Sequence, residues 1–114
     1  MRLNNRQMSK AIHDRTPAQN STGSLRLVLG SVWYTGRLPD SFVLLYKESR
    51  GNSKITHTVL SYQTPIAWRL TDGSWVIPET SYSVTTSRHQ GIVRVATSAP
   101  ESYFAQDAMS PGAR

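Results

Sequence analysis

The sequence predicts an α+β fold, in which a small, mostly antiparallel β-sheet or partly open barrel of about five short strands is covered by one C-terminal helix. Short apolar runs alternate with turn signals between residues 25 and 77, which is the pattern of strands joined by hairpins. Near residue 87 the apolar spacing changes to that of a helix. With 114 residues and no cysteine, the chain fits one domain whose core needs no disulfide.

The predicted strands alternate with loops rich in Gly, Pro, Asn and Asp. The first is a bent strand, in which Arg26 points outward and a bend at Gly30 and Ser31 joins two short runs. Residues 41–47, the most apolar run of the chain, are predicted as a central strand. In order, the strands cover residues 25–29 with 32–35, 41–47, 55–62, 65–70 and 74–77.

Two further elements follow from turn and capping chemistry. Asp72 and Gly73 lie between two aromatic-bearing runs, which is the strongest hairpin signal in the chain. Residues 87–96 are predicted as the helix, since hydroxyl residues precede apolar positions at helical spacing. A strand over residues 92–96 is the alternative, because Gly91 costs about 1 kcal/mol in a helix interior.

The two ends of the chain are less apolar than its middle. Residues 1–24 are predicted to be a basic flexible arm, because their composition buries too little apolar surface to offset the entropy of ordering. A short helix over residues 7–14 would require a packing partner. Residues 25–98 form the predicted single globular β-rich domain, and residues 99–114 a flexible tail in which Tyr103 and Phe104 could dock on a partner.

The charge balance is the one compositional indication of function. Thirteen Lys and Arg against seven Asp and Glu give a formal net charge of +6, which favours an encounter with a polyanion such as nucleic acid. The same charge is also within the ordinary range for a soluble small domain. No apolar run approaches the about 20 residues of a membrane helix, and no secretory signal is evident. We therefore expect a cytoplasmic protein without a membrane partner.

Three segments together resemble a module of uncharacterised small bacteriophage proteins, particularly those of actinobacterial phages. The segments are Ser61-Tyr62-Gln63-Thr64-Pro65-Ile66-Ala67, then Tyr82-Ser83-Val84-Thr85-Thr86-Ser87, and finally His89-Gln90. The resemblance covers about a quarter of the chain. It implies a phage-encoded accessory protein acting in the cytoplasm of the infected host cell, and it carries no activity with it.

The predicted nucleic-acid site lies around the start of the helix and the neighbouring hairpin. A helix start offers free N–H groups and partial positive charge to an anion, and two arginines could hold the same phosphate. The hydroxyl residues could equally cap the helix, and the tryptophan could stack on a base or fill the core. The candidate residues are Arg69, Arg88, Thr85, Thr86, Ser87 and Trp68.

Three further polar or aromatic residues of the helix region are predicted to be structural: His89, Gln90 and Tyr82. As a general base, His89 would need a nearby nucleophile and an acid, which the sequence does not indicate. Three scattered histidines without cysteine do not form a metal-site pattern, so we expect no metal, no cofactor and no catalysis. The predicted function is weak, non-specific nucleic-acid binding through a basic face, and the alternative is a protein that binds and perturbs a host or phage protein.

Overall fold

The computed structural model describes residues 2–80 and 82–98. Six strands form one sheet in chain order, β1 beside β2 only and β4 between β3 and β5. The first two strands are parallel, and every other neighbouring pair is antiparallel. The strands are β1 (Arg2–Leu3), β2 (Ala18–Asn20), β3 (Leu25–Leu29), β4 (Ile55–Ser61), β5 (Thr64–Leu70) and β6 (Trp75–Val76). The predicted mostly antiparallel α+β fold is confirmed.

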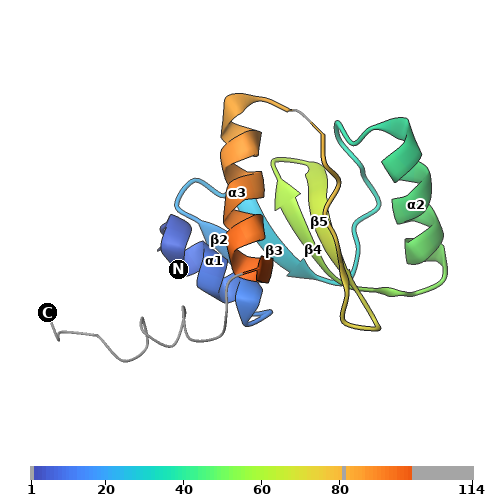
Figure 1. Cartoon of the computed structure of the whole chain (residues 1–114), viewed down its shortest axis with the longest axis horizontal. Coiled ribbons are helices and arrows are strands. Elements are labelled where there is room, and N and C mark those ends of the chain that lie inside the picture. The colour runs from blue at the N-terminus through green and yellow to red at the C-terminus, as the bar shows by residue number, and fades with distance from the viewer. Residues whose placement is uncertain (1, 81, 99–114) are drawn as a thin grey trace, which may run out of the picture.

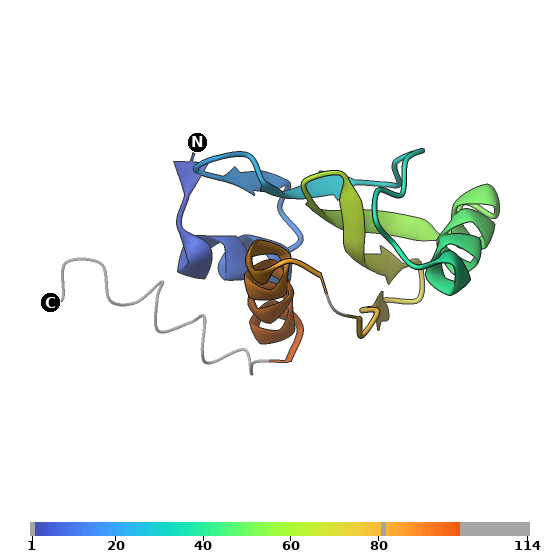
Figure 2. The same cartoon turned by 90° about the horizontal axis from the view of Figure 1, so that it is seen from above.

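Three helices cover this sheet: α1 (Asn5–His13), α2 (Asp40–Gly51) and α3 (Val84–Ser98). Figure 1 shows α1 and α3 together over one part of the sheet and α2 at the other side of the molecule. In the view from above, α1 and α3 lie side by side on one side of the strands (Figure 2). Successive residues of a strand face opposite sides of its sheet, so the two sides of β4 and β5 can be covered by different helices.

Each face of the sheet has its own hydrophobic cluster. Ala67 of β5 packs with residues of α1 and α3, whereas the next residue, Trp68, packs with residues of α2. Trp68 is 0% exposed, and its ring meets that of Tyr46 at a centroid distance of 4.8 Å and an interplanar angle of 77°. Such edge-to-face contacts are a preferred arrangement of buried aromatic rings. The molecule therefore has helices on both faces of the sheet rather than on one.

The C-terminal helix is confirmed, because α3 includes the predicted residues 87–96. The alternative strand over residues 92–96 is wrong. Ile92, Val93 and Ala96 are buried against the sheet and α1, and this burial compensates for the low helix propensity of Gly91.

Residues 2–20 correct the prediction of a flexible arm over residues 1–24. Asn4 and Gln7 form a reciprocal capping box at the start of α1, which satisfies two backbone N–H groups that the helix leaves free. Met8 and Ile12, one turn apart, are both fully buried in the core. A helix here was predicted to require a packing partner, and α3 is that partner. The strands that precede and follow α1 in the sequence, β1 and β2, pair with each other in the sheet.

Residues 41–47 correct the prediction of a central strand, because they belong to α2. Phe42, Val43 and Tyr46 face the core at helical spacing, while Leu44 is 72% exposed. Leu44 and its neighbour Leu45 are apolar residues on the solvent side, so the helical pattern is hidden in an unbroken apolar run. Residues 32–35 are also not a strand. They form a loop in which the Val32 N–H donates to the Tyr46 hydroxyl at 2.9 Å.

Two hairpins connect the last three strands. β4 and β5 are joined by Tyr62 and Gln63 alone, since Ser61 pairs with Thr64. The predicted Asp72–Gly73 hairpin between β5 and β6 is confirmed, and Gly73 has the positive φ, 91°, that favours glycine. No helix within residues 2–80 and 82–98 is long and apolar enough to cross a membrane.

Candidate functional site

A cleft of about 730 Å³ lies at the end of the sheet where β4 turns into β5. Five parts of the chain meet there, namely the loop at residue 23, β3 at Arg26, the loop at residues 36–37, the β4–β5 turn with its flanking residues, and the residue before α3. The lining residues are Gly23, Arg26, Gly36, Arg37, Ser61, Tyr62, Gln63, Thr64 and Ser83. The cleft is therefore lined mainly by glycine, hydroxyl, amide and guanidinium groups.

Tyr62 holds the tip of the turn in an uncommon backbone conformation. Its φ is 56°, a left-handed value that costs residues other than glycine about 1–2 kcal/mol. The Tyr62 N–H donates to the Ser24 carbonyl at 2.7 Å, and the Arg26 guanidinium donates to the Tyr62 carbonyl at 3.3 Å. These two bonds hold the turn, and the Tyr62 side chain remains 53% exposed beside the cleft.

A second loop approaches the turn closely on another side of the cleft. A side chain at Gly36 would clash with the Thr64 hydroxyl and the Gln63 carbonyl, and its φ of 52° also favours glycine. The backbone N–H of Arg37 donates to the Thr64 hydroxyl at 2.9 Å. Glycine at position 36 thus lets the loop reach the turn, so that the exposed Arg37 side chain lines the cleft.

A chain of hydroxyl groups ties the start of α3 to the end of β4. The Ser83 hydroxyl donates to Thr86 Oγ1 at 3.3 Å, and Thr86 Oγ1 and Ser61 Oγ share a hydrogen bond of 3.0 Å. Ser61 Oγ lies 2.7 Å from Nδ1 of His89. The hydroxyl groups therefore link Ser61 of β4 to residues 83–89 at the start of α3, which follow much later in the sequence.

Burial disfavours the protonated form of His89 in this arrangement. Its side chain is 5% exposed, and burial lowers the pKa of the imidazole below its ordinary value. The Tyr62 ring lies beside it at a centroid distance of 6.1 Å. Ser61 is 1% exposed. The pair therefore joins α3 to β4.

The charges around the cleft are all positive. Among the described residues that line it, Arg26 and Arg37 are cationic and none carries a carboxylate. Arg26 also donates to the Tyr34 hydroxyl at 3.1 Å, which fixes its guanidinium at the cleft. Elsewhere in the described residues, no group of three His, Asp or Glu side chains could hold a metal ion.

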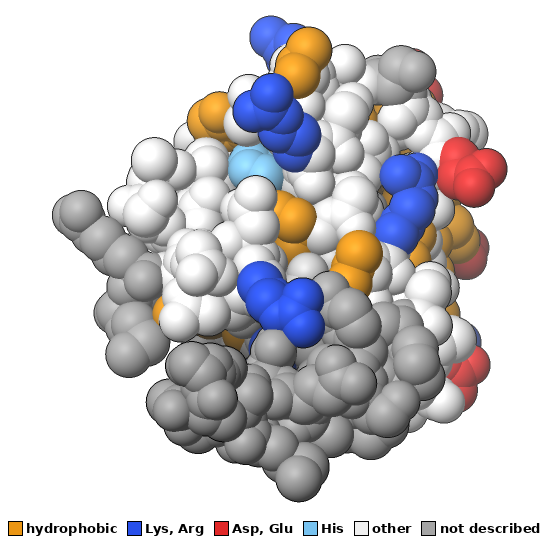
Figure 3. Space-filling view, turned by 60° about the vertical axis from the view of Figure 1, so that its left-hand side comes forward, with side chains coloured by type: hydrophobic (Ala, Val, Ile, Leu, Met, Phe, Trp, Pro, Cys, Tyr) orange, Lys and Arg blue, Asp and Glu red, His pale blue; other side chains and the backbone are white. Residues whose placement is uncertain are grey.

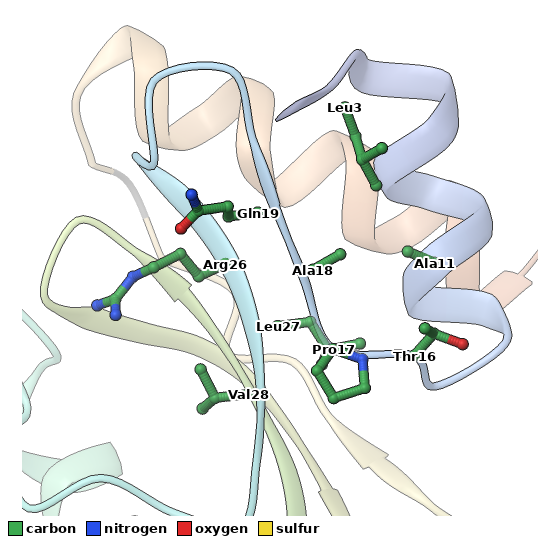
Figure 4. Close-up of a pocket in the computed structure, with 9 residues that line it drawn as sticks. All are labelled: Leu3, Ala11, Thr16, Pro17, Ala18, Gln19, Arg26, Leu27 and Val28. Carbon is green, nitrogen blue, oxygen red and sulfur yellow. The ribbon is translucent and has the colours of Figure 1, made fainter. Parts of the chain in front are cut away.

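A second pocket, of about 510 Å³, lies between α1 and the strands β2 and β3. Figure 4 shows that Leu3, Ala11, Ala18 and Leu27 face this space, whereas the Arg26 guanidinium points away from it. Its walls are mainly apolar and it lacks a convergent set of polar groups, which binding sites commonly use to orient a ligand. The cleft at the β4–β5 turn is therefore the stronger candidate.

The residues of the predicted nucleic-acid site do not form one site. Trp68 is in the core and cannot stack on a base, and Thr86 is 6% exposed with its hydroxyl bonded to Ser61. Arg88 lies in a groove between α1 and α3. Arg69 pairs with His57 in the sheet, near the hairpin at the opposite end of the strands from the start of α3 (Figure 1). His57, the strand partner of Arg69, and Ser61, which contacts the start of α3, are roughly 13 Å apart along β4, so Arg69 and the first turn of α3 lie at different ends of the strand.

The other predicted residues have separate surroundings. Thr85 and Ser87 are exposed in the first turn of α3, while the Ser83 hydroxyl accepts from the Thr86 N–H. The Gln90 side chain donates to the Thr80 carbonyl at 3.1 Å. Burial raises the pKa of Tyr82, whose buried hydroxyl has no hydrogen-bond partner within the described ranges. Tyr103 and Phe104 lie outside the described residues.

The comparisons with known proteins identify the family. The model of a family of unknown function, DUF8033, matches residues 35–103, which is more than half of the chain. This chain belongs to the DUF8033 family. The match includes the cleft residues from Gly36 to Ser83 and begins after Arg26. No curated protein and no solved structure matches the chain.

Sequence reasoning missed Arg26, Arg37 and Gln63 as members of one site. Residue 62 was expected to end a strand, so the two-residue turn at Tyr62 and Gln63 was not foreseen. The residues on both sides of that pair, 58–61 and 64–68, are continuously buried, so strict alternation did not mark the hairpin. No local pattern indicates that the loop at Arg37 packs against this turn.

Proposed function

We propose that this DUF8033 protein binds single-stranded nucleic acid weakly and without sequence preference at the cleft beside Tyr62. The observation that carries the proposal is the combination of an exposed aromatic ring with two arginines and no carboxylate in one cleft. Proteins that bind single strands combine a cationic groove with aromatic rings on which bases stack. The resemblance to phage modules extends the proposal: the protein would be a phage-encoded accessory protein that acts in the cytoplasm of the host cell.

Four of the cleft residues have distinct roles in this proposal. Arg37 contacts a phosphate from the rim, because guanidinium groups form paired hydrogen bonds to phosphate oxygens. Arg26 contributes charge while its existing bonds to Tyr34 and Tyr62 hold it in place. Tyr62 stacks on an unpaired base, and Gln63 offers an amide to the base edge. The function is binding without catalysis.

The test is a fluorescence anisotropy titration of labelled single-stranded and duplex DNA, and of single-stranded RNA, at two salt concentrations. The variants are Arg37→Ala and Tyr62→Ala. The control, Lys54→Ala, also removes one charge, but its exposed side chain precedes β4 and so lies roughly 25 Å from Tyr62 along the strand.

We expect the two variants to fail in different ways. Arg37→Ala weakens binding and lowers the slope of log affinity against log salt by about one, because one phosphate contact is lost. Tyr62→Ala weakens binding by about tenfold, as expected for one lost base stack, and leaves that slope unchanged. Duplex DNA binds less tightly because its bases are not free to stack. Absence of binding at low salt, or equal effects of all three substitutions, contradicts the proposal.

A second candidate function is the binding of a host or phage protein. The observation that favours it is the set of exposed apolar side chains on α2 and the preceding loop. Trp33 is 81% exposed and Leu44 72% exposed, and exposed apolar patches mark protein contacts when they are contiguous. If the cleft variants bind DNA as the native protein does, this function becomes the leading one.

A further inference from the structure

A shallow groove of about 460 Å³ runs between α1 and α3, separate from the cleft. The two helices are joined beneath it by the Ser9 hydroxyl, which donates to the Ile92 carbonyl at 3.1 Å. Gly91, Ile92 and Val95 line the groove from α3, and Val95 is 40% exposed. Apart from Arg88, the α3 side of the groove is therefore apolar, and it is open to solvent at Val95.

Gly91 is the unusual residue of this surface. Glycine in a helix interior destabilises the helix by about 1 kcal/mol relative to alanine. Glycines at helix contacts commonly allow close packing, but a Cβ built at Gly91 meets no atom within 4 Å. The glycine is thus not required for the packing of α1 on α3. What it provides is an empty space in the groove, into which a partner backbone or side chain can fit.

Among the described residues, the charged side chains that line the groove are both positive. Arg6 of α1 and Arg88 of α3 line it, and neither helix contains an Asp or Glu. Figure 3 shows Lys and Arg side chains spaced around apolar patches on this side of the molecule, with Asp and Glu only toward one edge. A second copy of the same face would bring like charges together, which disfavours self-association through it.

We propose that the α1–α3 groove docks an acidic amphipathic helix of a partner protein. The apolar side of that helix packs over Gly91, Ile92 and Val95, and a carboxylate on its flank pairs with Arg88 at the rim. Helix-in-groove recognition uses apolar anchors at helical spacing. The charge of the groove selects acidic over basic helices.

The glycine residues allow this proposal to be tested independently of nucleic-acid binding. The chain has seven glycines, of which Gly23 and Gly36 line the cleft and Gly91 lines the groove. Gly51 and Gly73 line neither and serve as internal references. Protein labelled with ¹⁵N only at glycine gives one backbone amide signal for each of these positions, so the two sites report separately.

The probe is a designed helical peptide with leucines along one side and glutamates on both flanks. Its control has lysines in place of the glutamates. We expect the acidic peptide to shift the Gly91 signal in a salt-dependent manner and to leave Gly23 and Gly36 unchanged. The lysine peptide should leave Gly91 unchanged. Single-stranded DNA is titrated in parallel and should shift Gly23 and Gly36.

Three results would overturn the inference: no shift of Gly91 with the acidic peptide, equal shifts with both peptides, or a shift of Gly91 with DNA. The last result would assign the groove to nucleic acid. If instead DNA shifts no glycine while the acidic peptide shifts Gly91, the groove proposal holds and the cleft proposal fails. The two proposals therefore fail by different observations.

Two substitutions at the groove sharpen this test. Arg88→Ala should weaken binding of the acidic peptide several-fold. Arg94 is an exposed arginine of the same helix outside the groove lining, so Arg94→Ala should leave the affinity unchanged. Gly91→Ala should stabilise the protein because alanine favours the helix. It should also lower the affinity for the acidic peptide, because a methyl group enters the groove. If Gly91→Ala left peptide affinity unchanged, the empty space would have no role in docking.

Discussion

At the scale of single residues, Tyr62 combines a strained, left-handed backbone conformation with an exposed side chain. Strained conformations persist where the surrounding structure fixes them, and they occur often at functional sites. Here the fixing contacts are the hydrogen bonds of the Tyr62 backbone with Ser24 and Arg26. Glycine would adopt the same turn with less strain, so a tyrosine at this position is explained best by what its ring contacts.

Tyr62→Gly should therefore stabilise the protein while weakening nucleic-acid binding. Relief of the left-handed strain gains about 1–2 kcal/mol, and the greater entropy of glycine in the unfolded chain offsets about 0.5–1 kcal/mol of it. Urea denaturation measures the result. Ser53→Gly is the control, because Ser53 has a similar φ of 55° but lies beyond the other end of β4. It should stabilise without changing binding, and a loss of stability in Tyr62→Gly would refute the strain argument.

His89 should make folding stability depend on pH. Its folded pKa is lowered by burial, as is that of His57, where the charges of Arg69 and Arg15 lower it further. The unfolded chain then binds more protons below pH 6.5, so stability is complete above that pH and falls as the pH drops toward the folded pKa. Asp72, whose pKa the Ser74 hydrogen bonds lower from 3.8, contributes only at more acidic pH.

Thermal unfolding at pH 5 and pH 7.5 measures this effect (both chosen to bracket the ordinary histidine pKa of about 6.5). The native protein should lose melting temperature at the lower pH. His89→Gln should lose less, since the glutamine has no proton to gain, and His57→Gln should also remove part of the dependence. An unchanged pH dependence in both variants would show that neither histidine is responsible.

At the scale of the elements, α1 shows how a polar segment can be an integral part of the core. Only two of its residues are large, apolar and fully buried, Met8 and Ile12. Their spacing of four residues and the capping box of Asn4 and Gln7 were visible in the sequence. The polar composition of the segment nevertheless favoured the prediction of a flexible arm. A helix with only two buried apolar side chains is stable only when another element, here α3, covers them.

Ile12→Ala tests whether α1 is part of the folded core. The substitution should cost about 2–5 kcal/mol, because it opens a cavity at a fully buried position. Val84→Ala is the matched control: Val84 is a β-branched residue of α3 that is 71% exposed, so its truncation should change stability by less than about 0.5 kcal/mol. Both are measured by chemical denaturation. Equal, small effects of the two substitutions would show that α1 does not contribute to the folded core.

The α2 helix is an apolar segment that the sequence predicted as a strand, whereas α1 is a polar segment that it predicted as an arm. Residues 41–47 are apolar enough for a buried strand, and no local pattern distinguishes a short apolar run in a sheet from one in a helix. The distinction comes from tertiary contacts. The Tyr46 hydroxyl accepts from the Val32 N–H and shares a hydrogen bond of 3.0 Å with Thr58, and the helix is therefore seated on the sheet through its tyrosine.

At the scale of the whole molecule, the sequence predicted the sheet, its antiparallel pairing and its C-terminal helix, because each depends on local alternation or turn chemistry. The Asp72–Gly73 hairpin and β4 are examples. It did not predict the second layer of helices or the cleft. Both arise where distant segments meet, as do Ser61 and His89 across 28 positions.

The arrangement of the strands predicts a gradient of local stability. β4 is paired on both edges and covered on both faces, whereas β1 and β6 are two-residue strands at the edges of the sheet. Amide hydrogen exchange should therefore be slowest in β4, with opening free energies near that of global unfolding, and fastest in β1 and β6. Faster exchange in β4 than in β6 would contradict the observed strand order.

The hydrogen bond between Ser9 and Ile92 joins residues 83 positions apart, and this has a consequence for synthesis of the chain. The sheet pairs in chain order, so a growing polypeptide can form its hairpins as they emerge. The first helix cannot complete its packing in this way, because its cover, α3, is made after every strand. During translation the apolar side of α1 stays open to solvent, or to a chaperone, until residues 92–96 have been added.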